Sequence, residues 1–197
     1  MARVKTYPDD LRDRLVAEAF ERLRHEHPDT VSLRELAASC GTSTNAIYSI
    51  FGGKDELINQ VCREARAEFA GPHYRLALEE PSLAVLAQSG TLYRSWAHAN
   101  PALYRLIFNA GSTTGRSVLN DEWFHPIRLL LQRLIDHGVL RPHDTREMAL
   151  SLWASTHGFV LLEMDVWPPG IFDTDRLYEA HLRNSIGTLL DPEALHA

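Results

Sequence analysis

The sequence predicts an all-α protein of about nine helices, with an N-terminal three-helix head and a larger helical body. Apolar residues recur with the helical period in almost every segment, and no stretch alternates between polar and apolar residues as a half-buried strand would. Short runs rich in Gly, Pro, Asn and Asp separate these segments and are typical of turns between helices.

Composition places the chain among ordinary globular proteins. Of its 197 residues 45% are hydrophobic and 23% are charged, which leaves enough apolar surface for a substantial core. No apolar run is long enough to span a membrane and the start lacks the apolar region of a secretory signal, so we expect a cytoplasmic protein with no membrane partner. Cys40 and Cys62 form no metal-ligand or disulfide pattern, and core packing is the preferred interpretation for both.

Local signals predict each helix of the head in turn. An apolar stripe from Leu11 to Leu23 indicates the first helix, with Asp9 or Asp10 available as its N-cap. Ser32 and Glu35 have the spacing of a capping box. They start a second, short helix, which a left-handed Gly41 would end. A third helix follows from Ser43 or Thr44 to Ile50, and after the Gly52-Gly53 break a fourth is expected over residues 54–70.

The body is predicted to hold longer helices joined by Pro- and Gly-containing connectors. "GPHY" at residues 71–74 is interpreted as the first connector and "EEPS" at 79–82 as the second. The expected helices cover residues 82–99, 101–109, 118–137, 144–166 and 174–190. The predicted organisation is therefore a head of residues 1–53, a connecting helix of 54–70 and a body of 71–197.

Two short helices joined by a glycine turn, braced by the helix before them, form a helix-turn-helix, whose second helix can enter the DNA major groove. On its outward face this helix carries short polar residues, of which Asn can pair with adenine while Ser and Thr contact bases or phosphates. Tyr48 offers a hydroxyl to a phosphate, and Lys54 and Arg34 supply positive charge. The candidate DNA-binding residues are Arg34, Ser43, Thr44, Asn45, Tyr48, Ser49 and Lys54.

The string "VSLRELAASCGTSTNAIYSIFGGKDELI" resembles the N-terminal domain of the TetR family of bacterial transcriptional regulators. The resemblance covers about residues 10–60, including the Gly-x-Ser turn, Tyr-x-x-Phe in the third helix and Lys-x-x-Leu at the start of the fourth. The chain departs from a strongly basic pattern, since residues 1–60 hold eight Lys and Arg against ten Asp and Glu. With a formal charge of −6 overall, electrostatic attraction to DNA should be modest and sensitive to salt.

In the body, "LYRSWAHANPALYRLIF" and "LSLWASTHGFVLLEM" resemble a subgroup with a Trp…His-Gly signature, here Trp153, His157 and Gly158. Trp153 and His157 share one helical face, and either packing at a helix crossing or a place in a ligand pocket would suit them; for His157 both interpretations stay open. The candidate pocket residues are Tyr93, Trp96, Phe108, Trp123, Trp153 and His157. Such walls, with few cations, predict an apolar or aromatic, largely uncharged effector.

The last two helices carry broad apolar faces that a monomer could bury only in part, and Leu182 and Ile186 are test positions on them. Two copies packed as a four-helix bundle would cover the remainder, and the resemblance implies the same homodimer. The sequence thus predicts a ligand-responsive regulator, a repressor released from a palindromic double-stranded DNA operator by a small effector.

A helical small-molecule-binding enzyme, or a helical scaffold without DNA binding, are the alternatives. The ten histidines could suit an enzyme, but they show no shared ligand spacing, and the sequence contains no HExxH, GxSxG or phosphate-binding loop. We therefore expect no catalytic residues, no metal site and no cofactor. Any three-helix bundle could also expose small polar residues, so DNA binding depends on the specific order of residues 40–57.

Overall fold

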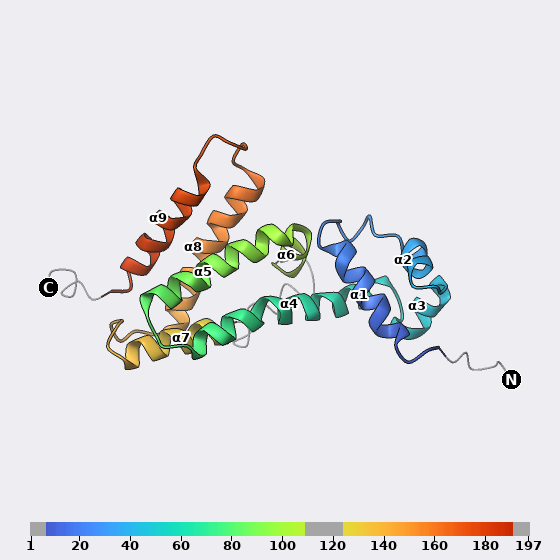
Figure 1. Cartoon of the computed structure of the whole chain (residues 1–197), viewed down its shortest axis with the longest axis horizontal. Coiled ribbons are helices and arrows are strands. Elements are labelled where there is room, and N and C mark those ends of the chain that lie inside the picture. The colour runs from blue at the N-terminus through green and yellow to red at the C-terminus, as the bar shows by residue number, and fades with distance from the viewer. Residues whose placement is uncertain (1–6, 109–123, 191–197) are drawn as a thin grey trace. The chain divides into compact units, whose positions relative to one another are not determined.

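The computed structural model describes residues 7–108 and 124–190, and all regular secondary structure within these ranges is helical (Figure 1), which confirms the all-α prediction. In the same ranges no helix is both long and apolar enough to cross a membrane. The helices are α1 (Leu11–Leu23), α2 (Leu33–Ser39), α3 (Thr44–Phe51), α4 (Lys54–Leu78), α5 (Leu83–Ala99), α6 (Pro101–Phe108), α7 (His125–Asp136), α8 (Thr145–Asp165) and α9 (Thr174–Gly187).

The described helices fall into two compact units. The first contains α1, α2, α3, the part of α4 up to Glu68, and α6; the second contains the rest of α4 with α5, α7, α8 and α9. The segment that begins at Ala99 and contains α6 groups with the first unit. The sequence had assigned the helix expected over residues 101–109 to the body.

The first unit is built on a small apolar core that includes Phe20 and Phe51. The apolar stripe of α1 is buried as its spacing predicted; α1 packs against α2, and α2 packs against α3. Arg24, at the end of α1, connects two further elements to it: its guanidinium bonds the carboxylate of Glu68 and the side chain of the buried Asn100, and its carbonyl accepts from Ala102 N at 3.2 Å. These bonds hold the start of α6 beside α1.

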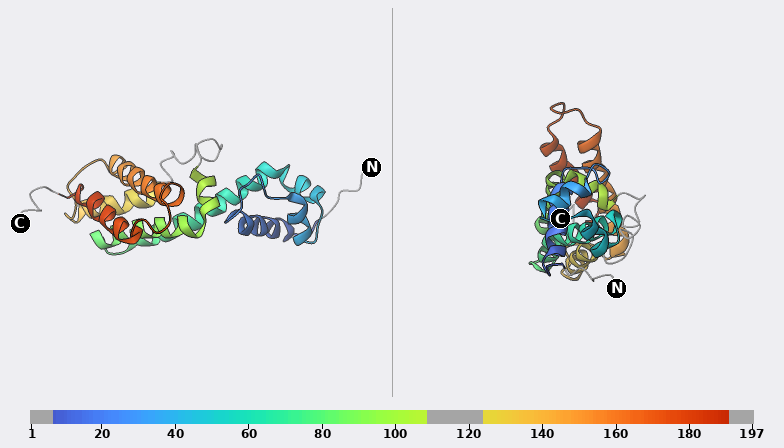
Figure 2. Two further views of the ribbon diagram at one scale, coloured as in Figure 1. Left: turned by 90° about the horizontal axis from the view of Figure 1, so that it is seen from above. Right: turned by 90° about the vertical axis from the view of Figure 1, so that its right-hand side faces the viewer.

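The second unit is a helical bundle in which α8 lies alongside both α7 and α9 (Figures 1 and 2). One cluster of its core is mainly aliphatic, with Phe124 and the half-buried Trp153 as its aromatic members. Burial of these side chains, at roughly 25 cal/mol for each Å² of apolar surface removed from water, is the main stabilising contribution.

The predicted connector "GPHY" is wrong, because α4 runs through Pro72 to Leu78. A proline inside a helix lacks one hydrogen bond and costs about 3 kcal/mol. Here the following turns bury Leu76 and Ala77 in the core of the second unit, and His73 Nδ1 lies 2.9 Å from the carbonyl oxygen of Phe69. Packing of the residues beyond the proline therefore outweighs its local preference to end the helix.

Candidate functional site

The turn between α2 and α3 is set by its glycine. Gly41 adopts φ +64°, and the N–H groups of Gly41 and Thr42 donate to the carbonyls of Ala38 and Ala37 at 3.0 and 2.9 Å. These two bonds satisfy the last carbonyls of α2 and fix where α3 begins. The left-handed conformation predicted for Gly41 is confirmed.

Capping positions the helix that precedes this turn. Ser32 Oγ accepts from Glu35 N at 3.4 Å, as the capping-box spacing predicted. The Glu35 carboxylate lies 3.5 Å from Arg22 Nη1 of α1, so it contributes to an exposed ion pair. Arg34 of α2 is exposed to solvent.

Helix α3 divides cleanly into an anchored face and an exposed face. Ala46, Ile47 and Phe51 are buried in the first unit, which fixes the rotation of the helix about its axis. Four predicted residues lie on the exposed side and a fifth is half-buried beside them. Exposed are Ser43, Asn45, Tyr48 and Ser49, and half-buried is Thr44.

Two details of this face favour contact with a partner. Tyr48 is 56% exposed, which is unusual for a large aromatic side chain without a ligand. Ser43 occupies the N-cap position of α3 in an extended conformation, yet its side chain makes no capping hydrogen bond. Its hydroxyl is therefore not committed to the helix end.

Lys54, the seventh predicted residue, is half-buried and turned to the protein itself. Its Nζ donates to the carbonyl oxygen of Val31 at 2.8 Å and to that of Asp29 at 3.4 Å. The ammonium thus holds the segment that leads into α2. The sequence missed this role, because the acceptors are backbone carbonyls more than twenty residues earlier and have no signature in side-chain types.

The second unit contains an apolar cavity of about 90 Å³. Helices α4, α5, α7, α8 and α9 all contribute to its wall, and among the described residues that line it there is no Asp, Glu, Lys or Arg. The lining residues are Phe69, Ala70, His73, Leu86, Ser89, Gly90, Tyr93, Phe124, Pro126, Ile127, Ala149, Leu152, Trp153, Thr156, Leu182, Ser185 and Ile186. A site of this composition suits a small uncharged molecule.

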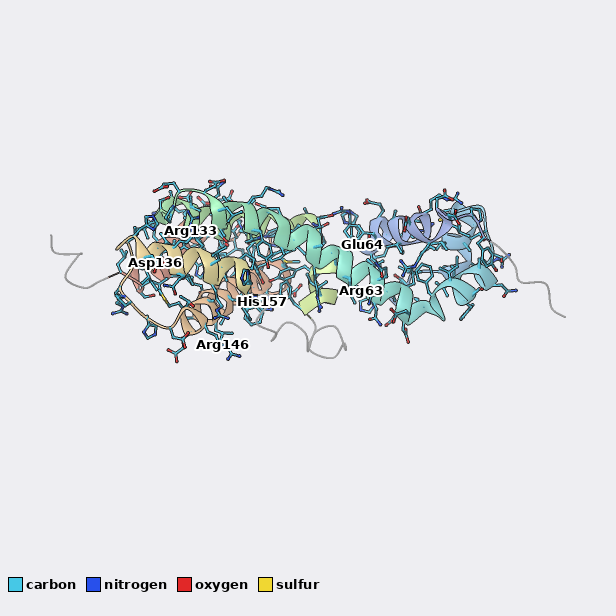
Figure 3. All side chains as sticks on the ribbon, turned by 90° about the horizontal axis from the view of Figure 1, so that it is seen from below. Arg63, Glu64, Arg133, Asp136, Arg146 and His157 are labelled. Atoms are coloured by element: carbon cyan, nitrogen blue, oxygen red, sulfur yellow. The ribbon has the colours of Figure 1, made fainter. Side chains whose placement is uncertain are left out.

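The structure brings together some of the predicted pocket residues. Tyr93 and Trp153 line the cavity, and Trp153 Nε1 donates to the Tyr93 hydroxyl at 3.2 Å. His157 stands one layer behind, stacked on Trp153 with ring centroids 5.0 Å apart, and its Nδ1 lies 3.0 Å from the Tyr93 hydroxyl oxygen. Figure 3 shows its side chain, on α8, among those of the second unit. Burial lowers the pKa of His157, so the neutral imidazole is favoured.

Three predicted pocket residues lie elsewhere. Trp96 packs edge-on against Phe69, which does line the cavity, with centroids 5.3 Å apart. Phe108 belongs to α6 in the first unit and packs against Tyr104. Trp123 lies outside the described residues.

A charged cluster in the second unit was not predicted at all. Arg94 of α5 bonds both carboxylate oxygens of Glu163 on α8, and its Nη1 bonds Asp175 on α9 at 2.8 Å. Burial alone would raise the pKa of Glu163, but hydrogen bonds from Arg94, His98 and Thr174 lower it to about 2. The cluster ties three helices together, and only the helix spacing of these residues could have hinted at it.

The two test positions on the apolar faces of the last helices are inward. Ile186 is buried in the core and Leu182 lines the cavity, so neither can report on a surface. The sequence could not tell which side of α9 the rest of its own chain would cover. The large apolar side chains that do lie exposed on or between α8 and α9 are Leu162, Val166, Ile171, Phe172 and Leu177.

Comparisons with known proteins agree with this architecture. Residues 15–61 match the model for bacterial regulatory proteins of the tetR family, and residues 86–184 match that for the C-terminal domain of tetracycline repressor-like proteins. No curated protein matches the chain.

Solved structures share the fold over nearly the whole chain. A protein of unknown function from Rhodococcus sp. RHA1 has a TM-score of 0.76 at 21% identity, covering 96% of this chain and all of its own. SmeT, the repressor of the multidrug efflux pump SmeDEF of Stenotrophomonas maltophilia, has a TM-score of 0.69 at 17% identity, covering 92% and 91%. A TetR/AcrR-family transcriptional regulator from Thermobifida fusca has a TM-score of 0.70 at 18% identity, covering 90% and 97%.

Proposed function

Because the chain belongs to the TetR family of bacterial regulatory proteins, and is thus a DNA-binding transcriptional regulator, we propose that it is a repressor released from a palindromic operator by a small uncharged effector. DNA binding is assigned to residues 1–53, with α4 as the connection, and effector binding and dimerisation to residues 71–197. Because such a regulator acts on operator DNA, the proposed place of action is the cytoplasm.

The observation that carries the proposal is the exposed face of α3. Its inward side is fixed by Ala46 and Ile47, so the polar side chains opposite have a defined orientation. Asn45 is the group able to read a base through two hydrogen bonds, with Thr44 beside it. Ser43, Tyr48 and Ser49 are assigned to bases or phosphates, and Arg34 to the backbone.

Two copies of the chain are needed to read a palindrome. The exposed apolar residues of α8, α9 and their connection form a surface that a second copy would cover, and a two-fold axis there makes the contact isologous. One half-site offers too few contacts for specific binding, so dimerisation should decide operator affinity.

The cavity of the second unit is the proposed effector site. Its lining is apolar and uncharged, which supports an uncharged effector with an aliphatic or aromatic body. SmeT represses a multidrug efflux pump, and such a role would suit a site that recognises mainly apolar shape. To act, the effector must bind one conformation of the protein better than the other, and operator DNA must weaken effector binding by the same factor.

The family consists of regulators, and we propose no catalytic activity for this chain. In the ranges that the structure describes, no group of three or more His, Cys, Asp or Glu side chains is arranged to hold a metal ion.

Selection of duplex DNA by the purified chain tests the function and requires no operator sequence at the outset. The protein is incubated with a random duplex library, bound DNA is recovered and amplified over several rounds, and the product is sequenced. A two-fold-symmetric motif that also occurs in the DNA upstream of the gene is the expected result. A library that stays random in sequence would contradict the proposal.

A further inference from the structure

The apolar wall of the cavity is interrupted by hydroxyl groups from three different helices. Ser89 comes from α5, Thr156 from α8 and Ser185 from α9, and all three line the cavity. Ser89 and Thr156 are each only 7% exposed. Polar groups buried to this degree normally have hydrogen-bond partners.

Ser89 lies on the side of α5 that faces the cavity. Its neighbour Thr91, on the solvent side of the same helix, bonds back to the carbonyl of Ala87 at 3.2 Å. The Ser89 side chain, by contrast, is buried from solvent and lies in the wall of the cavity. A ligand atom in the cavity could bond this hydroxyl, and one net hydrogen bond contributes about 1 kcal/mol.

The other two hydroxyls are weakly engaged. Thr156 Oγ1 lies 3.4 Å from His181 Nε2, at the long limit for such a bond, and Ser185 uses its carbonyl, not its hydroxyl, to accept from Thr188. A hydroxyl can both donate and accept, so this group of side chains can bond an alcohol or a carbonyl equally well.

From this arrangement we propose that the effector carries one uncharged hydrogen-bonding group, a hydroxyl or a carbonyl oxygen, which Ser89 binds with Thr156 and Ser185 beside it. The proposal rests on the proposed function of the cavity and adds the chemical class of its ligand: small apolar alcohols, phenols, ketones or lactones. Carboxylates and amines are excluded because no described lining residue offers a compensating carboxylate, ammonium or guanidinium group.

His73 is the one histidine among the described residues that line the cavity, and it does not change this conclusion. Burial lowers its pKa, although hydrogen bonds to the carbonyls of Phe69 and Ser89 oppose the effect. A neutral imidazole provides no counter-charge for a carboxylate.

Leu182 of α9 limits the size of the ligand that the cavity can hold. A Cβ atom placed on Gly90 would collide with Leu182 Cδ2, so the absence of a side chain at Gly90 lets Leu182 pack against α5 beside the hydroxyls. Leu182 therefore closes one side of the polar corner, and a single ring with one polar substituent is the expected scale of ligand.

Phenol and toluene test the proposed hydrogen bond from Ser89 to the ligand, since phenol carries a hydroxyl where toluene carries a methyl group. Their affinities for the full chain, for Ser89→Ala and for Ser95→Ala are measured by calorimetry, with NMR line positions as a second readout. Ser95 is an exposed serine on the same helix, so it is the matched control.

Ser89→Ala should lower the preference for phenol over toluene about fivefold, the value of one net hydrogen bond, while Ser95→Ala leaves it unchanged. Benzoate should bind at least about tenfold more weakly than phenol, because its charge would be desolvated. If the preference for phenol over toluene is the same in Ser89→Ala and in the unmodified chain, Ser89 does not bind the polar group of the ligand. If neither phenol nor toluene binds the unmodified chain at millimolar concentration, the cavity is not a ligand site and the effector part of the proposed function fails instead.

Discussion

The two units of the molecule use their polar residues in opposite directions. In the first, short polar side chains lie on the outside of α3, opposite the buried apolar side chains of Ala46, Ile47 and Phe51. In the second, hydroxyls from three helices face inward on an apolar cavity. An outward set can read a large partner such as DNA, whereas an inward set can read only a molecule small enough to be enclosed.

The two units also differ in the groups that their structural cations bond: backbone carbonyls in the first unit and carboxylates in the second. Lys54 bonds two backbone carbonyls and fixes the approach to α2. Arg94 bonds the carboxylates of Glu163 and Asp175 and fixes three helices. In a chain with a net charge of −6, both cations set geometry within their own unit, so specific contacts have to supply what general attraction to DNA does not.

The largest effect should come from the surface that we assign to dimerisation. Leu162→Glu places a charge on a side chain that is 42% exposed on α8, and loss of the second half-site should weaken operator binding by roughly 100-fold. Sedimentation should show the dimer dissociating in parallel. Leu78→Glu, at a leucine that is 71% exposed on α4, is the matched control and should keep both properties. A dimer that survives Leu162→Glu with full affinity would place the interface elsewhere.

Glu163→Gln should be the most damaging change inside the second unit. It leaves Arg94 without its buried counter-charge and should lower the free energy of unfolding by about 3 kcal/mol, measured by urea denaturation. Because the pKa of Glu163 falls from 4.5 to about 2 on folding, its contribution is complete above pH 4.5 and is lost as the pH falls toward 2. The unmodified chain should therefore lose more stability than Glu163→Gln across that window. Glu56→Gln removes an exposed carboxylate paired with Arg63 and should leave the midpoint unchanged; equal effects of the two changes would refute a special role for the cluster.

Lys54→Ala tests whether Lys54 stabilises the fold or contacts a DNA phosphate. Loss of its bonds to Val31 and Asp29 should cost about 2 kcal/mol of stability. DNA affinity should fall without a change in its salt dependence. Arg34→Ala should do the reverse, keeping stability and reducing the salt slope by about 0.9 for one phosphate. A reduced salt slope in Lys54→Ala would show that its ammonium reaches DNA.

The sequence predicted the first unit well, because its signals are local. The Ser32 cap, the left-handed Gly41 and the burial of Ala46 and Ile47 each depend on a few neighbouring residues, and together they orient α3. Lys54 is the exception in this unit, since its partners lie far back along the chain.

Prediction of the second unit reached the helices and only part of the cavity wall. Trp153 and Tyr93 were identified from residue type, yet Ser89 was not, because an ordinary serine becomes a candidate only once other helices enclose it. The same dependence on distant packing explains why α4 continues through Pro72 and why Ile186 is core and not surface. Long-range packing has no local signature in one sequence.

The most direct test of base reading by the outward face of α3 is the operator preference of Asn45→Ala. Binding of the selected DNA and of all its single base-pair variants is compared for the unmodified chain, for Asn45→Ala and for Asn184→Ala, whose asparagine is exposed on α9. Asn45→Ala should lose about 1.5 kcal/mol, roughly tenfold, and should cease to discriminate at one or two symmetric positions, while Asn184→Ala retains the full ranking. An unchanged ranking of operator variants in Asn45→Ala would contradict the assignment of this face to DNA bases.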